Sequence, residues 1–513
     1  MGMSLIEIYR EKVKKEWKIA FFAVIIIGFL IHIYKFTNTL PNHDSVYNYY
    51  SDQNIIGLGR WFLSIACGFS SYFDLPWVNG LFSVIFIAIA AIFITDIFEM
   101  KNPFQITLSS ALLVSFPAIT ETLFFEFTAD GYMLAMLLAA LAVWLTRIDK
   151  PGITRTIVSA VCICLACATY QAYVSFGLVL AFCYVIYKIL IGGGETKDYL
   201  QYAARQIIIY AAGLIAYYAI WQIVMQFQDA NASSYQGVAS VSLSLTTILQ
   251  AIPGTIKTLM FFFVEWNVFE HGWTLYGVLN VIFILLFIAF LIMAICKQRL
   301  FQRRGQLLLL LIALIAIPFA SCIWLFTSSD VSYRPMMLQS LCILYIFLGV
   351  IAEEFLRVRW KNLAGILLAI IVFNYGIMAN IAYYYMNQEY EASYAIASEI
   401  LTRIHLMDLD GEKIAVLGSD GTNVSLGDHD EYADKIHIFT ALLEENLLFD
   451  TVHTVLFINN TFDCDYDRAS DEEIETLELS DEVAEMGVWP ASDSIQMIGD
   501  TIVIKMSEVS ESP

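Results

Sequence analysis

The sequence is poor in charged residues, which fill only 15% of its 513 positions. Soluble domains carry about 25% charged residues, so this composition excludes an ordinary soluble protein. Hydrophobic residues take 58% of the chain instead. Apolar runs close to the ~20 residues that cross a bilayer recur along it. The composition therefore indicates a polytopic membrane protein.

Signals of metal binding and of a disulfide framework are also missing. Cys67 and Cys464 could form one pair, but one possible pair among nine cysteines is not a framework. Residues 463–473, DCDYDRASDEE, lack the glycine and the glutamate that a calcium loop needs at its sixth and twelfth positions. We predict no metal site and no cofactor, and leave a divalent cation open.

About eleven apolar runs are predicted to be transmembrane helices. The first has a basic segment before it and no small-residue cleavage site after it, so we expect a retained anchor. The runs lie at about 19–37, 77–98, 104–118, 127–146, 155–170, 172–191, 205–226, 274–296, 306–326, 335–352 and 363–385.

Lysine and arginine alternate between the connecting loops. One set of loops holds 19 of them, including those in KQRLFQRR and RVRWK, whereas the other set holds only Arg60, Lys257 and Arg334, with Lys35 at the end of the first run. Basic loops stay in the cytoplasm. The pattern predicts a cytoplasmic N-terminus and, with an odd number of spans, an external tail.

We divide the chain into a transmembrane domain, 1–386, and an acidic extracytoplasmic domain, 387–513. Residues 388–513 hold 5 basic and 29 acidic side chains, which argues against nucleic acid and other polyanionic partners. The tail contains no glycine-rich phosphate loop and no nucleophile elbow, so we expect it to bind or pack.

The tail pattern predicts a small α/β domain with at least one parallel strand pair. Helices are expected at 391–407 and 433–447. Strands are expected at 413–418 and 454–459, and a hairpin is expected around Gly499-Asp500.

Carboxylates, aromatic rings and isolated arginines gather in the loops predicted to lie outside. The candidate site residues are His43, Asp44, Arg60 and Trp61 in the first loop, Glu121, Glu126 and Asp130 in segment 117–132, Tyr170 and Gln171 in the next turn, and Tyr333 and Arg334 in segment 327–337. Segment 227–273 adds an amphipathic stretch.

These residue types suit sugar transfer from a lipid phosphate. Aromatic rings stack on sugars, and carboxylates accept hydrogen bonds from hydroxyls. The arginine fork fits phosphate, so Arg60 and Arg334 are the phosphate candidates and the other residues are candidates for binding sugar or acceptor. Outside the cell there is no pool of nucleotide sugars, so the sugar donor must be delivered on a membrane lipid. A polyprenyl-phosphate sugar is such a donor.

Several stretches resemble the bacterial GtrII-type O-antigen glucosyltransferase family, within the GT-C superfamily. They are HDSVYNYY with GLGRWF, then FPAITETLFFEFTADGYMLAMLLAALA, TYQAYVSF, YRPMMLQ and MGVWPASDSIQMIGDTIVIKM. GT-C enzymes often have an acidic pair in the first loop, whereas His43-Asp44 supplies one carboxylate.

The resemblance implies a GT-C-like fold in a bacterial inner (plasma) membrane. It also implies an inverting enzyme that moves a hexose, often glucose, from undecaprenyl phosphate to a cell-surface polysaccharide. Asp44 is then the general base.

Two alternatives remain open at this point. One is a lipid-linked-sugar flippase or glycan polymerase of the same pathway, although carboxylates at the aqueous rim suit a reaction better than a transport path. The other is a non-enzymatic membrane anchor for the external domain.

Overall fold

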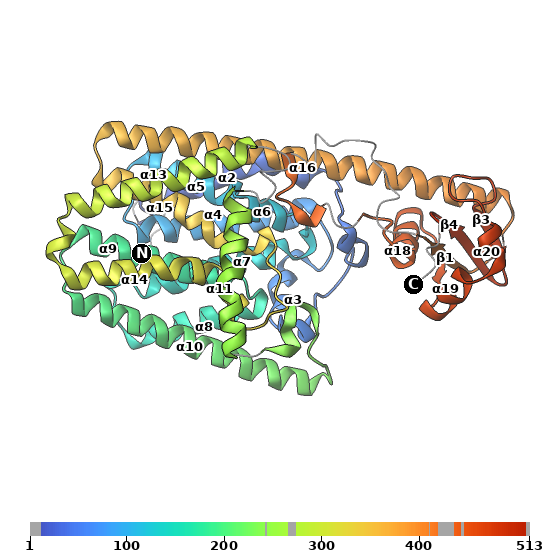
Figure 1. Cartoon of the computed structure of the whole chain (residues 1–513), viewed down its shortest axis with the longest axis horizontal. Coiled ribbons are helices and arrows are strands. Elements are labelled where there is room, and N and C mark those ends of the chain that lie inside the picture. Colours follow the sequence, from blue (N-terminus) through green and yellow to red (C-terminus); the bar gives the residue numbers. More distant parts are fainter. Residues whose placement is uncertain are drawn as a thin grey trace, which may run out of the picture. The chain divides into compact units, whose positions relative to one another are not determined.

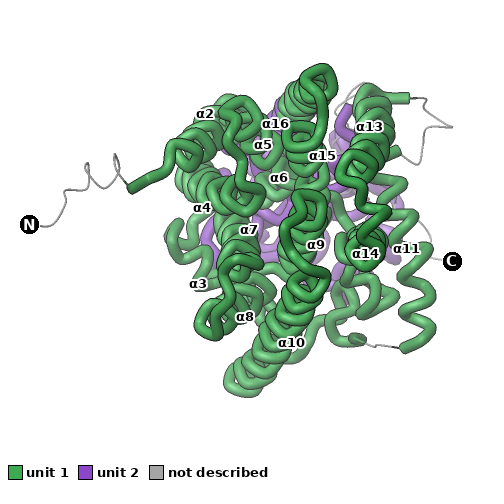
Figure 2. The backbone as a smooth tube through the Cα atoms, turned by 90° about the vertical axis from the view of Figure 1, so that its left-hand side faces the viewer, with its two compact units in different colours: residues 1–37, 52–379 green, residues 38–51, 380–513 purple. Residues whose placement is uncertain are grey.

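The computed structural model describes residues 12–241, 244–264, 273–409, 411–418, 435–442 and 446–508. They form two compact units (Figure 2). Unit 1 comprises Met1–Thr37 and Asp52–Ala379, and unit 2 comprises Asn38–Ser51 and Asn380–Pro513. Unit 2 thus joins a loop from near the start of the chain, which the sequence pattern assigns to the transmembrane domain, to the C-terminal region.

Unit 1 is a helical bundle (Figure 1). Nine described helices, including the long α16 that continues into unit 2, are long and apolar enough to cross a membrane. The chain is therefore a multi-pass membrane protein. Eight of the eleven predicted runs fall on these long helices, the runs at 104–118, 155–170 and 335–352 fall on helices of 13, 17 and 14 residues, and the ninth long helix, α11 (Leu245–Val264), was not predicted as a span. The helices are α2 (Lys15–Thr37), α3 (Leu63–Cys67), α4 (Pro76–Ile97), α5 (Pro103–Ser115), α6 (Pro117–Thr122), α7 (Glu126–Leu145), α8 (Ile153–Thr169), α9 (Tyr173–Ile191), α10 (Thr196–Phe227), α11 (Leu245–Val264), α13 (Leu275–Lys297), α14 (Arg304–Ser321), α15 (Cys342–Phe355) and α16 (Val358–Leu406).

Helix α11 lies in the segment predicted as an external amphipathic stretch. Figure 1 shows it running across the long helices rather than along them. Thr247, Ala251 and Thr255 are buried on one face, while Leu249 and Ile256 are among the exposed apolar residues of the other. Such a helix suits the membrane interface, and a helix in the interface leaves the predicted alternation of loops unchanged. The rest of the predicted stretch, 265–272, lies outside the described residues.

Segment 117–132 differs from the prediction of an external loop. Pro117 begins α6 and Glu126 begins α7, so most of the segment is helical. Glu121 and Asp130 are 0% exposed. The carboxylates that made this segment look like a solvated loop instead find partners inside the bundle.

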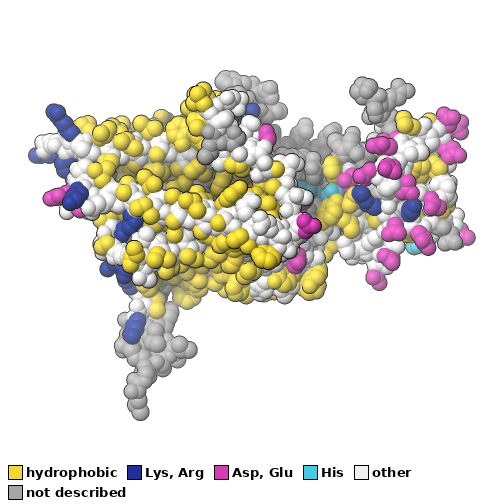
Figure 3. Space-filling model, turned by 90° about the horizontal axis from the view of Figure 1, so that it is seen from below, with side chains coloured by type: hydrophobic (Ala, Val, Ile, Leu, Met, Phe, Trp, Pro, Cys, Tyr) yellow, Lys and Arg dark blue, Asp and Glu magenta, His cyan; other side chains and the backbone are white. Residues whose placement is uncertain are grey.

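Basic side chains gather at one end of unit 1, and hydrophobic side chains cover its sides (Figure 3). At that end Asp96 of α4 forms ion pairs with Lys14 at 2.6 Å and Arg147 at 2.7 Å. Lys297 donates to the carbonyl of Phe355 at 2.9 Å. Loops predicted on one side of the membrane thus meet at one end of the bundle.

Unit 2 contains a four-stranded sheet with the strand order β2-β1-β4-β3. β1 pairs in parallel with β2 and β4, and β3 pairs antiparallel with β4. A helical polytopic protein with a small C-terminal α/β unit is the predicted fold class, which is confirmed. The strands are β1 (Lys413–Leu417), β2 (Asp467–Arg468), β3 (Ile495–Ile498) and β4 (Thr501–Lys505), and the helices that follow β1 are α18 (Thr451–Phe462), α19 (Asp471–Glu478) and α20 (Asp481–Glu485).

Two predictions in this unit need comment. Residues 454–459 belong to helix α18, not to a strand. Asp450 caps that helix by accepting from the backbone N–H of His453 at 2.8 Å. A short β-branched apolar run fits a buried helix as well as a strand. The Asp450 cap favours the helix here. The predicted helix at 433–447 lies partly outside the described residues, and its described part holds the short turn Thr440–Leu442.

Candidate active site

Three segments of unit 1 meet at the ends of helices opposite the basic loops. The segment before α3 is joined to the α8–α9 turn, because Phe62 donates its backbone N–H to Ala168 at 3.0 Å. The side chain of Gln171 donates to Leu58 O at 2.7 Å. Trp324, which follows α14, donates its indole N–H to Gln171 O at 3.0 Å. These bonds hold the predicted Gly-Arg-Trp and Tyr-Gln motifs side by side.

Gly59 is required at this junction. Its φ is 76°, a left-handed conformation that favours glycine, and a Cβ there would collide with the hydroxyl of Tyr217. That hydroxyl accepts from Gln171 at 3.2 Å. The glycine therefore lets the chain turn tightly and place Arg60 against the α8–α9 turn.

Arg60 is held by two tyrosines. Its Nη1 donates to the hydroxyl of Tyr132 at 2.9 Å, and its guanidinium lies 4.8 Å from the ring centre of Tyr170. The two rings are stacked, with centroids 4.3 Å apart and planes 12° apart. Burial raises the pKa of Tyr170 above its ordinary value, although the charge of Arg60 opposes this shift. Tyr170 therefore acts as a neutral partner of the guanidinium.

Arg60 has no carboxylate partner among the described residues, and its Nε donates to none of them. The side chain is only partly exposed. A partly desolvated guanidinium held by neutral rings keeps its full charge and several donors. This arrangement is suited to an anion that has two or three acceptor oxygens.

Segment 327–337 reaches the same end of the bundle. The hydroxyl of Tyr333 accepts from the backbone N–H of Trp324 at 3.2 Å. Arg334 precedes the turn Pro335–Met337. The carboxylate of Glu121 accepts from the backbone N–H of Met336. Glu121 thus ties α6 to the segment that carries Tyr333 and Arg334.

The other two predicted carboxylates lie in separate buried environments. Glu126 forms an ion pair with Lys35 at 2.9 Å, and both side chains are at most 2% exposed. Asp130 accepts from the backbone N–H of Gly131 at 2.8 Å. Glu121, Glu126 and Asp130 therefore do not form one acidic cluster.

Trp61 is partly buried against a hydrophobic cluster that includes Cys167 and Val174. Ile65 of α3 and Phe69 of the following 3-10 turn, Gly68–Ser70, are 61% and 60% exposed. These exposed apolar side chains fit the interfacial stretch that the sequence suggests here, while Trp61 itself packs.

Asp44 and His43 belong to unit 2, in the short 3-10 helix His43–Tyr47. The side chain of Asp44 is 49% exposed, and His43 Nε2 lies 3.7 Å from its carboxylate. Ser45 and Asn42 close the turn, with the Asn42 side chain accepting from Ser45 N at 3.0 Å. The turn therefore presents one accessible carboxylate on an ordered backbone.

The model of the GtrII glucosyl transferase family matches residues 33–353, more than half of the chain. The chain belongs to the GtrII glucosyltransferase family. It is therefore a membrane glycosyltransferase, and the alternative of a non-enzymatic membrane anchor is wrong. No curated protein and no solved structure matches it. The family match includes the Arg60 and Asp44 segments and ends before unit 2 resumes at Asn380.

Sequence reasoning missed several residues that lie at this candidate site. Tyr132 was quoted within a motif but given no role, although an arginine in an apolar setting needs an aromatic or acceptor partner. Gln339 and Tyr173 lie within the motifs YRPMMLQ and TYQAYVSF, which give them no role of their own. They are buried and lie close enough to interact with each other, although the Gln339 amide and the Tyr173 hydroxyl form no well-aligned hydrogen bond within the described chain. Buried polar groups normally have partners, so these atoms are candidates for holding sugar hydroxyls.

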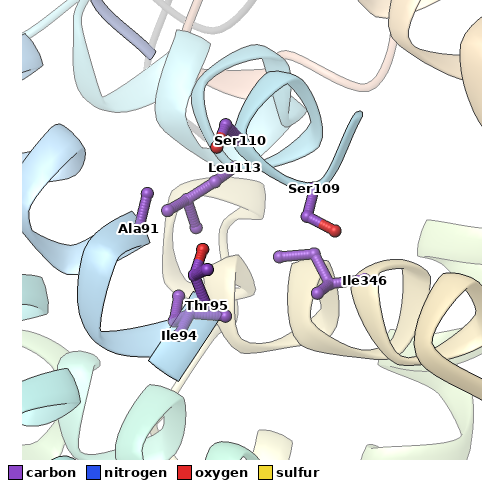
Figure 4. Close-up of a pocket in the computed structure, with 7 residues that line it drawn as sticks. All are labelled: Ala91, Ile94, Thr95, Ser109, Ser110, Leu113 and Ile346. Atoms are coloured by element: carbon purple, nitrogen blue, oxygen red, sulfur yellow. The ribbon is translucent and has the colours of Figure 1, made fainter. Parts of the chain in front are cut away.

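Two further features bear on ligands. Among the described residues, no group of three His, Cys, Asp or Glu side chains is placed to hold a metal ion, and none of the nine cysteines forms a disulfide there. A narrow space between α4, α5 and α15 is lined by Thr95, Ser109 and Ser110 with apolar side chains (Figure 4). It contains no charged group and lies next to Asp96 at the basic end of α4, so it does not suit a phosphate.

Proposed function

We propose that the enzyme moves a hexose, first of all glucose, from undecaprenyl phosphate to a cell-surface polysaccharide such as an O-antigen. The observation that carries this proposal is the Arg60 site, a guanidinium held by Tyr132 and Tyr170 without a carboxylate partner among the described residues. A phosphate monoester or diester supplies the oxygens that such a fork recognises. Arg334 is the second candidate phosphate ligand.

The proposed reaction has one displacement step. The acceptor hydroxyl attacks the anomeric carbon, the bond from that carbon to the phosphate oxygen breaks, and the configuration inverts. Asp44 takes the hydroxyl proton, and the lipid phosphate leaves with the bonding electrons. Arg60 stabilises the negative charge that grows on the leaving phosphate.

Stacked tyrosines beside the arginine support a sugar-phosphate ligand. Tyr132 and Tyr170 offer aromatic surface, and the nearby Gln171 is already engaged with Leu58 and Tyr217. The buried amide of Gln339 lies close to Tyr173 and forms no well-aligned hydrogen bond among the described residues. His43, Trp61 and Tyr333 remain candidates for contacts to sugar or acceptor, whereas Glu126 and Asp130 are now better candidates for stabilising the bundle.

We also propose that the basic end of unit 1 faces the cytoplasm and that the Arg60 end faces outward, in a bacterial inner membrane. The alternation of lysine and arginine supports this orientation. A lipid-linked donor is then presented at the outer face. The partners are this donor, the polysaccharide acceptor and the bilayer.

Purified enzyme in proteoliposomes tests the function directly. Undecaprenyl-phosphate glucose is added with a polysaccharide acceptor, and transfer is followed by mass spectrometry and by the anomeric NMR signal of the product. We expect transfer with inversion from the lipid donor and none from UDP-glucose. Efficient transfer from UDP-glucose, or retention of configuration, would refute the proposal.

A further inference from the structure

The candidate catalytic loop is built into the C-terminal unit. Residues 38–51 group with Asn380–Pro513, not with the helical bundle from which they emerge. Val46 is 1% exposed and belongs to the hydrophobic core that also contains Val455, Ile458 and Ile400. A residue from the first loop of the chain therefore completes the core of a unit formed more than 300 residues later.

Three side-chain contacts join the loop to helix α18. The Asn460 side chain donates to the carbonyl of Val46 at 3.2 Å. The ring of Tyr47 meets the ring of His453 edge-on, with centroids 4.9 Å apart and planes 88° apart. The ring of His43 lies 6.4 Å from that of His453. Contacts thus flank Asp44 on both sides along the chain.

His453 is itself held in place. Its Nδ1 lies 2.7 Å from the Asp450 carboxylate, and the ring of Phe449 packs against it at 5.4 Å. Burial raises the pKa of Asp450, but the hydrogen bonds from His453 outweigh this effect and lower the pKa below its ordinary value. An ionised Asp450 orients the imidazole that Tyr47 touches.

Burial along the turn alternates sharply. His43 is 6% exposed and Ser45 is 1% exposed, while the Asp44 side chain between them is 49% exposed. Asn48 donates to the backbone carbonyl of Asp44 at 2.8 Å. A loop that served only to connect two helices would not need a buried anchor, a closed turn and a docking helix around one exposed carboxylate.

We propose that α18 is a holder for the catalytic loop, with Tyr47, His453 and Asn460 as positioning residues for Asp44. This inference rests on the proposed role of Asp44 as the base. It gives the C-terminal unit a function in the transfer reaction, because a misplacement of about 1 Å can cost a reacting group ~10²-fold in rate. The unit is then a part of the enzyme, not an appended domain.

The first test measures docking without reference to activity. Amide exchange of the peptide that covers 38–51 is followed by mass spectrometry in the full chain, in wild type, in a Val46→Ala, Tyr47→Ala double variant and in Asn460→Ala. We expect exchange to be at least threefold faster in both variants and near wild type in Tyr47→Phe, which keeps the ring. Peptides of β1 and β4 serve as the folding control and are expected to keep wild-type exchange.

The second test measures the consequence for catalysis. In the double variant we expect kcat to fall about tenfold while the KM for the lipid donor changes less than twofold. The single variant Tyr47→Phe, which keeps the ring, is expected to have the kcat of the wild type. In an Asp44→Asn background the same double variant is expected to lower kcat no further, because the base is already absent.

The outcomes separate the two proposals. Unchanged amide exchange of 38–51 in the double variant would overturn the proposal that α18 positions the loop. Faster exchange with an unchanged kcat would overturn it as well. A near-wild-type rate in Asp44→Asn alone would show that Asp44 is not the base. Helix α18 would then have no role in catalysis, even if amide exchange showed that the loop docks on it. Faster exchange of β1 and β4 would instead show that Val46 and Tyr47 serve only to fold the unit.

Discussion

Replacing Arg60 by alanine is expected to lower kcat/KM for the lipid donor about ten- to hundredfold. The guanidinium spends one described hydrogen bond on Tyr132, and its Nε has no partner in the described chain. At least one charged hydrogen bond therefore remains for the donor phosphate. Such a bond contributes about 1.5–3 kcal/mol, and 1.4 kcal/mol corresponds to a factor of ten.

The assay is initial-rate transfer from undecaprenyl-phosphate glucose in proteoliposomes, with donor concentration varied. Arg60→Lys is expected to recover only part of the loss, because an ammonium lacks the planar fork. Tyr132→Phe removes the hydroxyl that orients Nη1 and is expected to cost about three- to tenfold. Lys257→Ala is the matched control, since Lys257 is an exposed cation on helix α11 and is expected to have no effect.

Wild-type kcat/KM in both Arg60→Ala and Arg334→Ala would refute the proposal that these arginines bind the donor phosphate. An equal loss in Arg60→Ala and Lys257→Ala would show that only general surface charge matters. A loss confined to protein yield, with unchanged kcat/KM, would assign Arg60 to packing of the two tyrosines.

Asp44→Asn is expected to lower transfer ~10²-fold or more at unchanged donor KM in the same assay, whereas Asp52→Asn stays near wild type, and the opposite ranking would displace Asp44 as the base. Glu126→Gln removes the carboxylate that lies 2.9 Å from the buried ammonium of Lys35 and is expected to destabilise the bundle by about 3 kcal/mol, measured as early thermal aggregation in detergent; wild-type thermal behaviour would contradict it. A cysteine at exposed Ser492 in a cysteine-depleted variant is expected to react with an impermeant maleimide in intact cells, and labelling only after lysis would reverse the proposed orientation.

The helical frame was predictable because its signal is composition and length. Runs such as 77–98 and 172–191 match α4 and α9 within two residues, since nothing except a helix satisfies backbone hydrogen bonds in a bilayer. Helix α11 was harder to interpret, because an amphipathic stretch with Pro253 and Lys257 fits a wet loop or an interfacial helix equally well. Its apolar face can be assigned to the membrane interface only once the structure shows which face is buried.

The site was predictable in part, and the reason differs between residues. Arg60 and Tyr170 stood out because an arginine is rare and a tyrosine cluster is unusual on that side. The roles of Glu121 and Glu126 depended on Met336 and Lys35, which are distant in sequence. A carboxylate looks the same in one dimension whether it faces a sugar, a backbone N–H or a buried ammonium. The docking of Val46 on α18 was likewise hidden, since helix 451–462 read as a strand.

The choice of tyrosines rather than a carboxylate around Arg60 has a physical consequence. A carboxylate at ion-pair distance would neutralise the guanidinium, and the donor phosphate would have to displace it. The hydroxyl of Tyr132 and the ring of Tyr170 orient the fork while leaving its net charge for the ligand. A fully buried and unpaired cation would be costly, and the partial exposure of Arg60 limits that cost before the donor arrives. In the proposed reaction, negative charge on the phosphate grows as the bond from sugar to phosphate breaks. Full positive charge at Arg60 would then stabilise the transition state more than the bound donor, which is the requirement for a residue that raises kcat and not only affinity.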